Sequence, residues 1–358
     1  MTHSGIPLSG GVGWIEKKTA LSAPDSIQVQ PGLTLIEPRK QPVPLMNTPT
    51  LPDTAMVQSA ARSIGLEPRA AAPGADVTVD HGPVTLTVSI SGDSDEPCVI
   101  ALLQYNGNVT AADYVTALVA ANAVNSTPRA PHTYLSAPGG EPLRTVLAPG
   151  ENTSAADAAP LDVTARLVFP IGEGVTGGQI AGLIRTALCI GEELAETMAK
   201  AVPDSAPSTG KTPGRSSIRS TTQDLPPLTR ERITGWFAAR GVEEVPFDEE
   251  TSTVCLAMDG TPVDIILADP EHVVIRVAAR VPATGEPDPG QLLHVCNHAN
   301  ALSTTAAVCA VQQSGEWWLV SRVGVPVAAG VSDAQVDAVI RAGVIGAGSQ
   351  LKAVLRQV

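Results

Sequence analysis

Apolar positions in the last third of the chain recur first at helical spacing and then in short runs of strand length. Ile233, Trp236 and Phe237 form one apolar stripe behind Thr229, a residue type that favours the position before a helix, and Gly241 ends the stretch. The pattern then predicts strands at 253–258, 263–267 and 273–281, a helix at 289–303, strands at 306–312 and 317–325, and a helix from 335 towards 356.

This order of elements, α-β-β-β-α-β-β-α, indicates an α+β fold. The dipeptide Asp259-Gly260 separates two of the predicted strands and is typical of a hairpin turn. Hairpin-linked strands flanked by helices indicate an antiparallel sheet with helices packed on it. We therefore expect an antiparallel sheet in this block.

The preceding part of the chain repeats the same order. The expected elements are a helix at 55–64, strands at 76–80, 84–91 and 98–105, a helix at 111–125, strands at 132–135, 143–147 and 161–170, and a helix at 179–199. Residues 137–160 are rich in Gly, Pro and Ala and form an insertion that the later block lacks.

Local motifs also recur in the same order in both blocks. The stretch 174–185 matches 330–341, with a Gly-Val-Thr/Ser triplet, a following Gln and an Ile-Arg pair at equal positions. In the middle helices, Asn122-x-x-Asn125 matches Asn297-x-x-Asn300. The first helices of the two blocks also resemble each other after a small shift. The sequence therefore predicts a tandem duplication, with domains at 50–201 and 227–358.

Two segments lack any period and separate or precede these domains. Residues 1–49 contain many prolines, which are excluded from helix interiors and central strands, so an extended tail is expected. Its apolar patches around Trp14 and Ile36 are suited to pairing with a sheet edge or docking in a groove. Residues 202–226 are rich in Ser, Thr and Pro and are expected to be a linker.

Charge and cysteine content exclude several classes of protein. The net charge of −13 argues against binding nucleic acid or an anionic membrane surface. We find no apolar run long enough to span a membrane and no secretory signal at Met1–Trp14, so a cytoplasmic location is expected. The five cysteines lack C-x-x-C spacing and are expected to be small buried residues: Cys98, Cys189, Cys255, Cys296 and Cys309.

The motif Leu292-Leu293-x-x-Cys296-Asn297-x-x-Asn300 resembles the YbjN family of bacterial proteins. The resemblance extends from about 228 to 355 and reaches the earlier block only through the internal repeat. It departs from the family at Ala299, where an aromatic residue is usual. The resemblance implies a fold similar to type III secretion chaperones and a helix–sheet platform for protein contacts, without established chemistry. The Ala- and Val-rich composition suggests a high-GC bacterium such as an actinobacterium.

One cluster in this helix has the residue types of a metal site. His294 and His298 are four residues apart and share a helix face, a workable spacing for metal ligands. Cys296 lies about 200° around the helix from both, since each residue turns about 100°, so the cluster offers two ligands rather than three. No Glu lies between the histidines, as it does in H-E-x-x-H. The alternative is that the histidines lie at the surface or its boundary and Cys296 in the core.

Other residues are candidates for recognition. Asn297 and Asn300 either contact another protein or satisfy buried backbone groups near a strand, and their recurrence in both blocks favours the structural interpretation. Trp317 and Trp318 are neighbours in a strand and must face opposite sides of the sheet, so one is expected in the core and the other at an interface. Trp14 is a further candidate contact in the tail.

The glycines of 172–178 have the spacing of a phosphate-binding loop, G-x-G-x-x-G, between a strand and a helix. The matching stretch of the later block lacks this spacing, and no acidic residue follows in a βαβ unit, so we interpret the loop as a strand-to-helix turn. We find no nucleophile motif such as G-x-S-x-G either.

The sequence therefore predicts a non-catalytic, chaperone-like or regulatory module that binds another protein and needs no cofactor. The duplicated domains are expected to pair as a pseudo-dimer, a step that rests on the resemblance. Two alternatives remain open. One is a metal-dependent regulator or enzyme that uses His294 and His298. The other is a structural subunit whose tail, from Trp14 to Ile36, inserts into a neighbouring copy.

Overall fold

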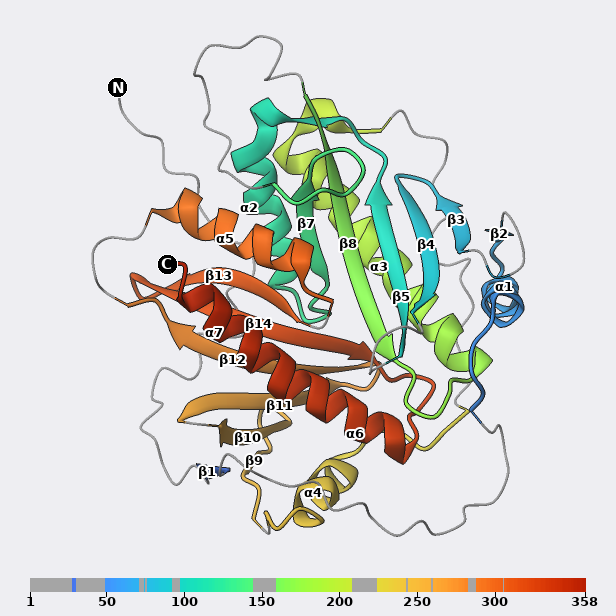
Figure 1. Ribbon diagram of the computed structural model, residues 1–358, viewed down its shortest axis with the longest axis vertical. Helices are drawn as coiled ribbons and strands as arrows, with labels where there is room; N and C mark the ends of the chain where they lie inside the picture. Colours follow the sequence, from blue (N-terminus) through green and yellow to red (C-terminus); the bar gives the residue numbers. More distant parts are fainter. Residues whose placement is uncertain are drawn as a thin grey trace.

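The computed structural model describes residues 28–29, 49–70, 74, 76–91, 97–143, 159–207, 224–242, 244–258, 260–282, 288–304 and 306–358. It is a mixed helix and sheet structure with two sheets, which agrees with the predicted α+β class (Figure 1). Most of the tail, including Trp14, and most of the predicted linker lie outside the described residues.

The first sheet is formed by the earlier block. Its elements are α1 (Thr54–Ser63), β2 (Arg69–Ala70), β3 (Val77–His81), β4 (Val84–Ser91), β5 (Cys98–Tyr105), β6 (Val109–Thr110), the short 3-10 helix η2 (Ala111–Asp113), α2 (Tyr114–Asn125), β7 (His132–Ser136), β8 (Pro160–Pro170), α3 (Gly177–Ala201) and the short 3-10 helix η3 (Pro203–Ser205). The strands lie in the order β2-β3-β4-β5-β8, and both β7 and β6 pair with β8.

The second sheet is formed by the later block. Its elements are α4 (Arg230–Ala238), β9 (Phe247–Asp248), β10 (Thr253–Met258), β11 (Thr261–Asp269), β12 (His272–Arg280), α5 (Pro289–Leu302), β13 (Ala307–Gln313), β14 (Glu316–Pro326), α6 (Asp333–Arg341), the π-helix η5 (Ala342–Gly346) and α7 (Ala347–Leu355). The strands lie in the order β10-β11-β12-β14-β13, and β9 and β1 (Gln28–Val29) both pair with β10.

The five main strands are therefore arranged in the same way in both sheets. The first three form a meander. The fifth strand, β8 or β14, lies beside the third, and the fourth strand, β7 or β13, lies beyond it at the edge. All these pairs are antiparallel, and among the described strands only β1 adds to its neighbour in parallel. We call the two sets of elements the first half and the second half of the molecule.

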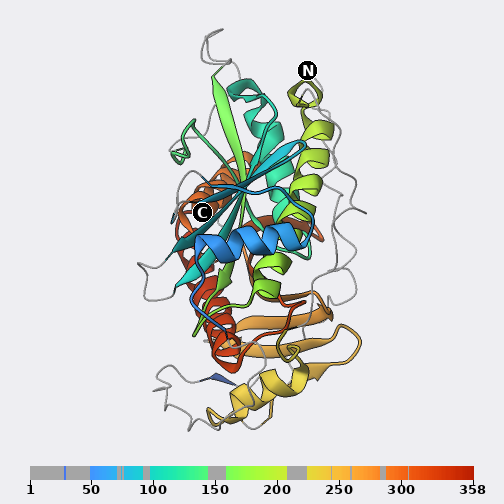
Figure 2. The ribbon, with the colours of Figure 1, turned by 90° about the vertical axis from the view of Figure 1, so that its right-hand side faces the viewer.

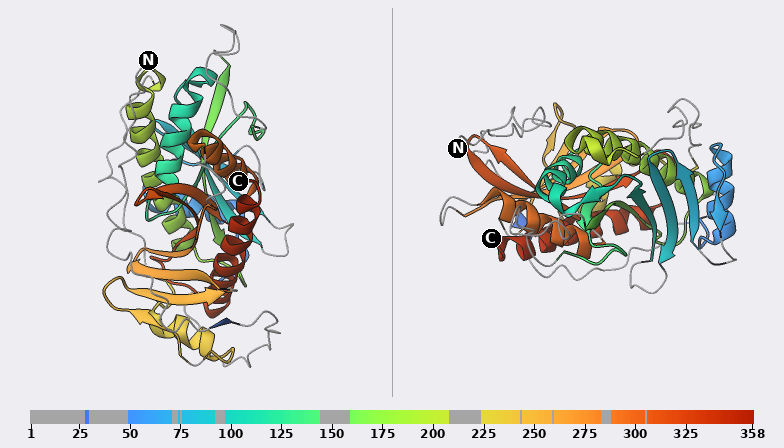
Figure 3. Two further views of the ribbon diagram at one scale, coloured as in Figure 1. Left: turned by 90° about the vertical axis from the view of Figure 1, so that its left-hand side faces the viewer. Right: turned by 90° about the horizontal axis from the view of Figure 1, so that it is seen from above.

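Helices cover the sheets in a matching manner. The long helix α3 packs on β4, β5 and β8, and the run from α6 to α7 packs on β12 and β14. The left panel of Figure 3 shows α2 beside α3 on one side of the molecule and α5 near α7 on the other. Figure 2 shows α1 on the side of the first sheet and α4 beside the second.

Helix starts follow the local sequence. The side chains of Thr229 and Ser332 accept hydrogen bonds from backbone amides of the first turns of α4 and α6, as expected for these residue types. Thr176 does the same for α3, and Gln179 returns a bond to the Thr176 amide, which completes a capping box. Most strands and helices lie within a few residues of the predicted ranges.

Two predictions of local structure differ from the fold. The strand expected at 143–147 is not seen at Leu143, and the rest of that range lies outside the described residues. The last helix was expected to be continuous but contains the π-helical turn η5, at whose start Gly343 packs against Ile275. A β-carbon at Gly343 would lie 2.1 Å from Cδ1 of Ile275, so the close approach requires glycine.

The last helical run also has the length and composition of a membrane span. Residues Asp333–Leu355 reach a mean hydropathy of 1.2 over an 18-residue window, of which 39% is buried in the structure. Val336, Val339, Ile340, Leu351 and Val354 are buried, and α7 packs on β12 and β14. The apolar side of this run therefore has a place in the core, as in a core helix of a globular domain.

Candidate functional site

The two halves meet where α2 and α5 pack beside each other above β7 and β13 (Figure 1). Each of these helices contacts the edge strand of its own half and the edge strand of the other half. We call this region the junction. It contains the paired asparagine motifs that the sequence marked as candidates.

The first asparagine of each motif reaches across the junction. The amide oxygen of Asn297 accepts from the backbone nitrogen of Leu135 at 2.7 Å, and its nitrogen donates to the Leu135 carbonyl at 2.9 Å. Asn122 binds Ala310 in the same way, with both distances at 2.8 Å. Each helix therefore holds one residue of the opposite edge strand by both of its backbone groups.

The second asparagine of each motif binds the edge strand of its own half. Asn125 accepts from the Thr133 nitrogen at 2.6 Å and donates to the Thr133 carbonyl at 2.8 Å. Asn300 forms the equivalent pair with Val308, at 2.7 and 2.9 Å. Thus β7 is held at two alternate residues by one asparagine from each half, and β13 is held in the same way.

These contacts are reciprocal. Asn122 and Asn297 are separated by the same number of residues as their partners Leu135 and Ala310, and the same spacing relates Asn125 to Asn300. A side-chain amide carries one acceptor and two donor hydrogens, so it can replace a neighbouring strand for one residue of an edge. The four asparagines therefore satisfy the edge groups at which β7 and β13 would otherwise lack partners.

Arginines from the two sheets cap the ends of the same helices. Arg166 on β8 donates to the carbonyl of Ser303, the residue that ends α5, at 2.5 Å. Arg322 on β14 donates to the carbonyls of Ser126 and Thr127 at the end of α2, at 2.6 and 3.2 Å. A cation at the carboxyl end of a helix interacts favourably with its dipole, so each half stabilises a helix end of the other.

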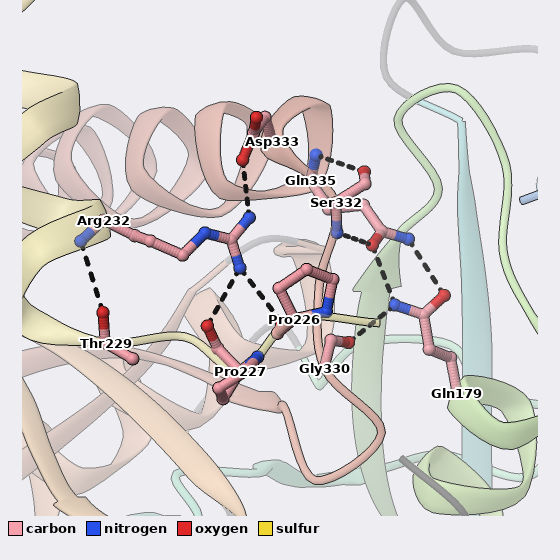
Figure 4. Close-up of polar contacts among 9 residues, drawn as sticks. All are labelled: Gln179, Pro226, Pro227, Thr229, Arg232, Gly330, Ser332, Asp333 and Gln335. Carbon is pink, nitrogen blue, oxygen red and sulfur yellow. Dashed lines mark hydrogen bonds and ion pairs between the residues drawn. The ribbon is translucent and has the colours of Figure 1, made fainter. Parts of the chain in front are cut away.

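Two glutamines join the halves at a second point, at the starts of α3 and α6 (Figure 4). The Gln179 side-chain nitrogen donates to the oxygen of Gln335 at 2.8 Å and to the Gly330 carbonyl at 2.8 Å. The Gln335 nitrogen donates to the Gly174 carbonyl at 2.9 Å, the reciprocal contact. Both glutamines are buried, and each oxygen also accepts from the backbone nitrogen of its own capping residue, Thr176 or Ser332.

Four histidines bind a group in the opposite half, three of them at the junction and one, His272, at the start of β12. The ring of His294 shares a 2.5 Å hydrogen bond with the Tyr114 hydroxyl, and His298 donates to the Leu143 carbonyl at 3.2 Å. His132 donates to the Ser303 carbonyl at 3.4 Å, and His272 lies 3.1 Å from the Thr186 hydroxyl.

Burial keeps most of these histidines neutral. The pKa of His132 is lowered to about 3, first by burial and then by the charge of Arg166, while the bond to Ser303 opposes the shift. Burial likewise lowers the pKa of His272, although the carboxylate of Asp269 acts in the other direction. The pKa of His294 is lowered by burial and then by His298. Burial therefore favours the uncharged imidazole at His132, His272 and His294.

The predicted metal cluster is not completed by further ligands. Among the described residues, no group of three or more His, Cys, Asp and Glu side chains is placed to hold a metal ion. The ring nitrogens Nδ1 of His294 and His298 already bind Tyr114 and Leu143. Cys296 is buried, and burial raises the pKa of its thiol well above the usual value, an effect to which Cys309 adds. These contacts match the core interpretation of Cys296.

The sequence-predicted recognition residues fall in different places. Asn297 and Asn300 are only 3% and 1% exposed and bind backbone within the chain, so neither offers a surface to another protein while the halves stay together. Trp317 is half-buried against the core, and Trp318, also half-buried, lies beside it in β14. Trp14 lies outside the described residues.

A hollow that sequence reasoning missed lies between α1 and the start of α3. Its volume is about 580 Å³. Small side chains and backbone line most of it, and Asp224 closes one side by accepting from the Gly178 nitrogen at 3.0 Å. The lining residues come from three distant parts of the chain, 55–64, 177–181 and Asp224, and Ala, Ser and Gly carry no chemical signal that would bring them together.

Comparison with known protein families shows a match in the second half. The model of the YbjN family, described as "Putative bacterial sensory transduction regulator", matches residues 229–349. A YbjN family domain therefore starts at the residue that caps α4 and ends within α7. No curated protein matches the chain. The crystal structure of YbjN from E. coli, described as "a putative transcription regulator", is 21% identical, covers 35% of this chain and 87% of that chain, and has a TM-score of 0.27.

Proposed function

We propose that this chain is a non-catalytic regulator that binds another protein, and that its two halves are duplicated YbjN-like domains paired as a pseudo-dimer. The observation that carries the proposal is the reciprocal junction, in which Asn122 and Asn297 hold each other's edge strands. Two copies that meet around a twofold axis use the same surface twice, so that each contact occurs in two equivalent forms. The glutamine pair and the two capping arginines repeat this arrangement.

The proposed absence of catalysis follows from how the polar groups of the junction are used. Catalytic groups need a reacting atom within reach and a cavity to hold it. The asparagine amides at the junction and the glutamine amides at the second contact point bind backbone, and burial favours the uncharged imidazole of His132. Such groups fix the arrangement of the halves, and no cofactor is required for that task.

The proposed contact surface for the partner protein is the end of the β13–β14 hairpin together with Trp14. Trp317 packs against the core, whereas Trp318 points to the other face of the sheet, because neighbouring residues of a strand alternate. Tryptophan side chains with one free face are common anchors of protein interfaces. Trp318 is therefore the side chain whose removal is expected to affect binding more than folding.

The test is affinity capture of the tagged full-length chain from its own cells after mild cross-linking, with mass spectrometry of the captured proteins. Trp318→Ala and Trp14→Ala are compared with Leu302→Ala, which removes an apolar side chain that is 62% exposed at the end of α5. A stoichiometric partner that is captured by the wild type and the Leu302 variant, but lost in either tryptophan variant, supports the proposal.

Two other outcomes contradict it. Capture of the chain alone, with concentration-dependent mass that disappears when residues 1–49 are deleted, favours a self-associating structural subunit. Stoichiometric metal in the purified protein that is lost in His294→Ala favours the metal-dependent alternative. Thermal unfolding of every variant separates loss of a partner from loss of the fold.

A further inference from the structure

The outer edges of the two sheets are covered differently. In the first half, β2 pairs with β3 through Arg69 and Ala70, which lie a few residues before β3 in the chain. In the second half, two short strands share the free side of β10. The local strand β9 covers its beginning, and β1, from the distant N-terminal segment, covers its end.

Backbone geometry identifies the groups of β10 that face outward. Ala257 lies opposite Pro262 in the β10–β11 pair, and proline has no N–H to donate. Ala257 therefore belongs to a non-hydrogen-bonded pair, and its N–H and C=O point away from β11. Cys255, two residues earlier, must point the same way, and its nitrogen does donate outward to the Pro246 carbonyl at 2.9 Å.

The strand β1 lies against this outward-facing part of the edge. Gln28 is level with Ala257 and Val29 with Met258, and the two strands run parallel. In the part of this sheet that the structure describes, every other pairing is antiparallel, so the contact with β1 is not an extension of the local meander. In the sequence, Ile27-Gln28-Val29-Gln30 alternates apolar and polar residues and is followed by Pro31, which suits one short added strand.

We infer that the outer edge of β10 is a binding site for one extended peptide strand, added in parallel, and that Gln28–Val29 is its resident occupant. Strand addition of this kind uses backbone hydrogen bonds for affinity, and side chains contribute mainly to selectivity. The paired length is two residues, so the resident strand is held by few bonds. The strand β1 therefore occupies the edge, and another strand can take its place.

The inference concerns the backbone of β10 and is independent of the proposed surface at Trp318. It predicts competition between the resident segment and an added peptide. A tethered segment acts at a high effective concentration, so the wild-type chain is expected to bind the free peptide weakly. Once the resident strand cannot pair, the site is open. The apparent affinity for the free peptide then rises in proportion to the fraction of chains whose site is open.

The test uses the full chain with both residues of β1 changed to proline, Gln28→Pro with Val29→Pro. One of two neighbouring residues in a strand must present its N–H to β10, so the double change removes that donor whichever residue supplies it. The matched control is Gln28→Ala with Val29→Ala, which keeps both N–H groups. The probe is a fluorescent peptide with the sequence of residues 22–33, and binding is followed by fluorescence anisotropy.

The expected result is that the double-proline chain binds the peptide about tenfold or more tightly than the wild type and the double-alanine chain. Hydrogen exchange of residues 253–258, followed by mass spectrometry, locates the contact. Protection should fall in the double-proline chain and return when the peptide is added.

A double-proline chain that dimerises, and returns to the mass of one chain when peptide is added, also supports the inference. In that case the open edge of β10 pairs with a second copy until the peptide displaces it. Equal peptide binding by all three chains, or no change in exchange of residues 253–258 in the double-proline chain, overturns the inference.

Discussion

The inner edges of the two sheets, β7 and β13, lie beneath α2 and α5, whereas the outer edges, at β3 and β10, lie at the rim of the molecule. All four strands present backbone groups that have no further main strand beside them. At the inner edges these groups bind the side chains of four asparagines. At the outer edges they bind strands of only two residues, β2, β9 and β1.

Access to water explains this difference. An unpaired backbone group in a buried position retains its full desolvation cost, while the same group at a rim can bind water. The inner edges therefore need side chains of defined geometry, and the asparagine positions are fixed by that need. The outer edges tolerate short and exchangeable strands. The junction therefore contributes to stability, and the outer edge of β10 remains available for binding.

The largest expected effect is at the junction, from Asn297→Leu. Leucine has a similar size, so the change leaves little cavity, but it leaves the N–H and C=O of Leu135 without a partner. Each buried, unsatisfied group costs about 1–3 kcal/mol, so the free energy of unfolding should fall by about 3 kcal/mol. Urea unfolding followed by circular dichroism measures this loss.

The matched variant Asn122→Leu breaks the equivalent contact to Ala310. Asn122 is half-buried, whereas Asn297 is 3% exposed, so water can replace part of what is lost at Ala310. A smaller loss of stability is therefore expected for Asn122→Leu. Equal and negligible losses in both variants would show that the asparagines do not hold the edges.

The asparagine motifs could be found from the sequence, but their partners could not. The recurrence of the motif in both blocks favoured a structural role for Asn297 and Asn300, and that interpretation, a bond to buried backbone, matches the contacts observed. Which strand each amide binds depends on how α5 lies between β7 and β13. Leu135 is 162 positions from Asn297, and no pattern within one helix encodes that distance.

The element order was predictable because local signals agree with the fold. Capping residues such as Thr229 and Ser332, alternating strands and hairpin turns each act over a few residues. Contacts between the halves depend on how the two halves dock, and they could not be predicted from the sequence. His272 gave no signal in the sequence because its partner Thr186 lies in α3 of the other half. The hollow at α1 was missed because the Ala, Ser and Gly residues that line most of it carry no chemical signal.

Acid should weaken the junction by an amount second only to the asparagine change. The folded-state pKa of His132 is about 3, below the unfolded value of about 6.5, so below pH 6.5 the unfolded chain binds more protons. Stability is then full above pH 6.5 and falls as the pH drops. His132 alone should remove about 2 kcal/mol of the free energy of unfolding by pH 5. Burial of His272 and His294 acts in the same direction.

The measurement is urea unfolding between pH 7.5 and pH 5 for the wild type and for His132→Gln. The glutamine variant carries no titrating group at this position, so its stability should fall less steeply over this range, whatever its stability at pH 7.5. Parallel curves for the two proteins would show that His132 does not titrate as its burial requires.

A smaller effect is expected when a helix end at the junction loses its cap, in Arg322→Met. The carbonyls of Ser126 and Thr127 lose a charged donor, which is destabilising. The same change removes the cost of burying a guanidinium, whose pKa is lowered by that burial. The net loss should be about 1–2 kcal/mol in urea unfolding. Arg322→Lys keeps the charge but not the geometry of the donors, so an intermediate loss is expected, and a lysine variant less stable than the methionine variant would contradict this account.

The smallest effect on stability is expected at the rim, from the double change Gln28→Pro with Val29→Pro. It removes the pairing of β1 with Ala257 and Met258, a contact of two residues at an edge where water can take over. Regions of this kind open locally without global unfolding. The free energy of unfolding should therefore change by less than about 1 kcal/mol relative to the double-alanine control, measured in the same urea titrations. A loss as large as that of Asn297→Leu would mean that β1 is part of the core structure, and the division between a structural inner edge and an exchangeable outer edge would fail.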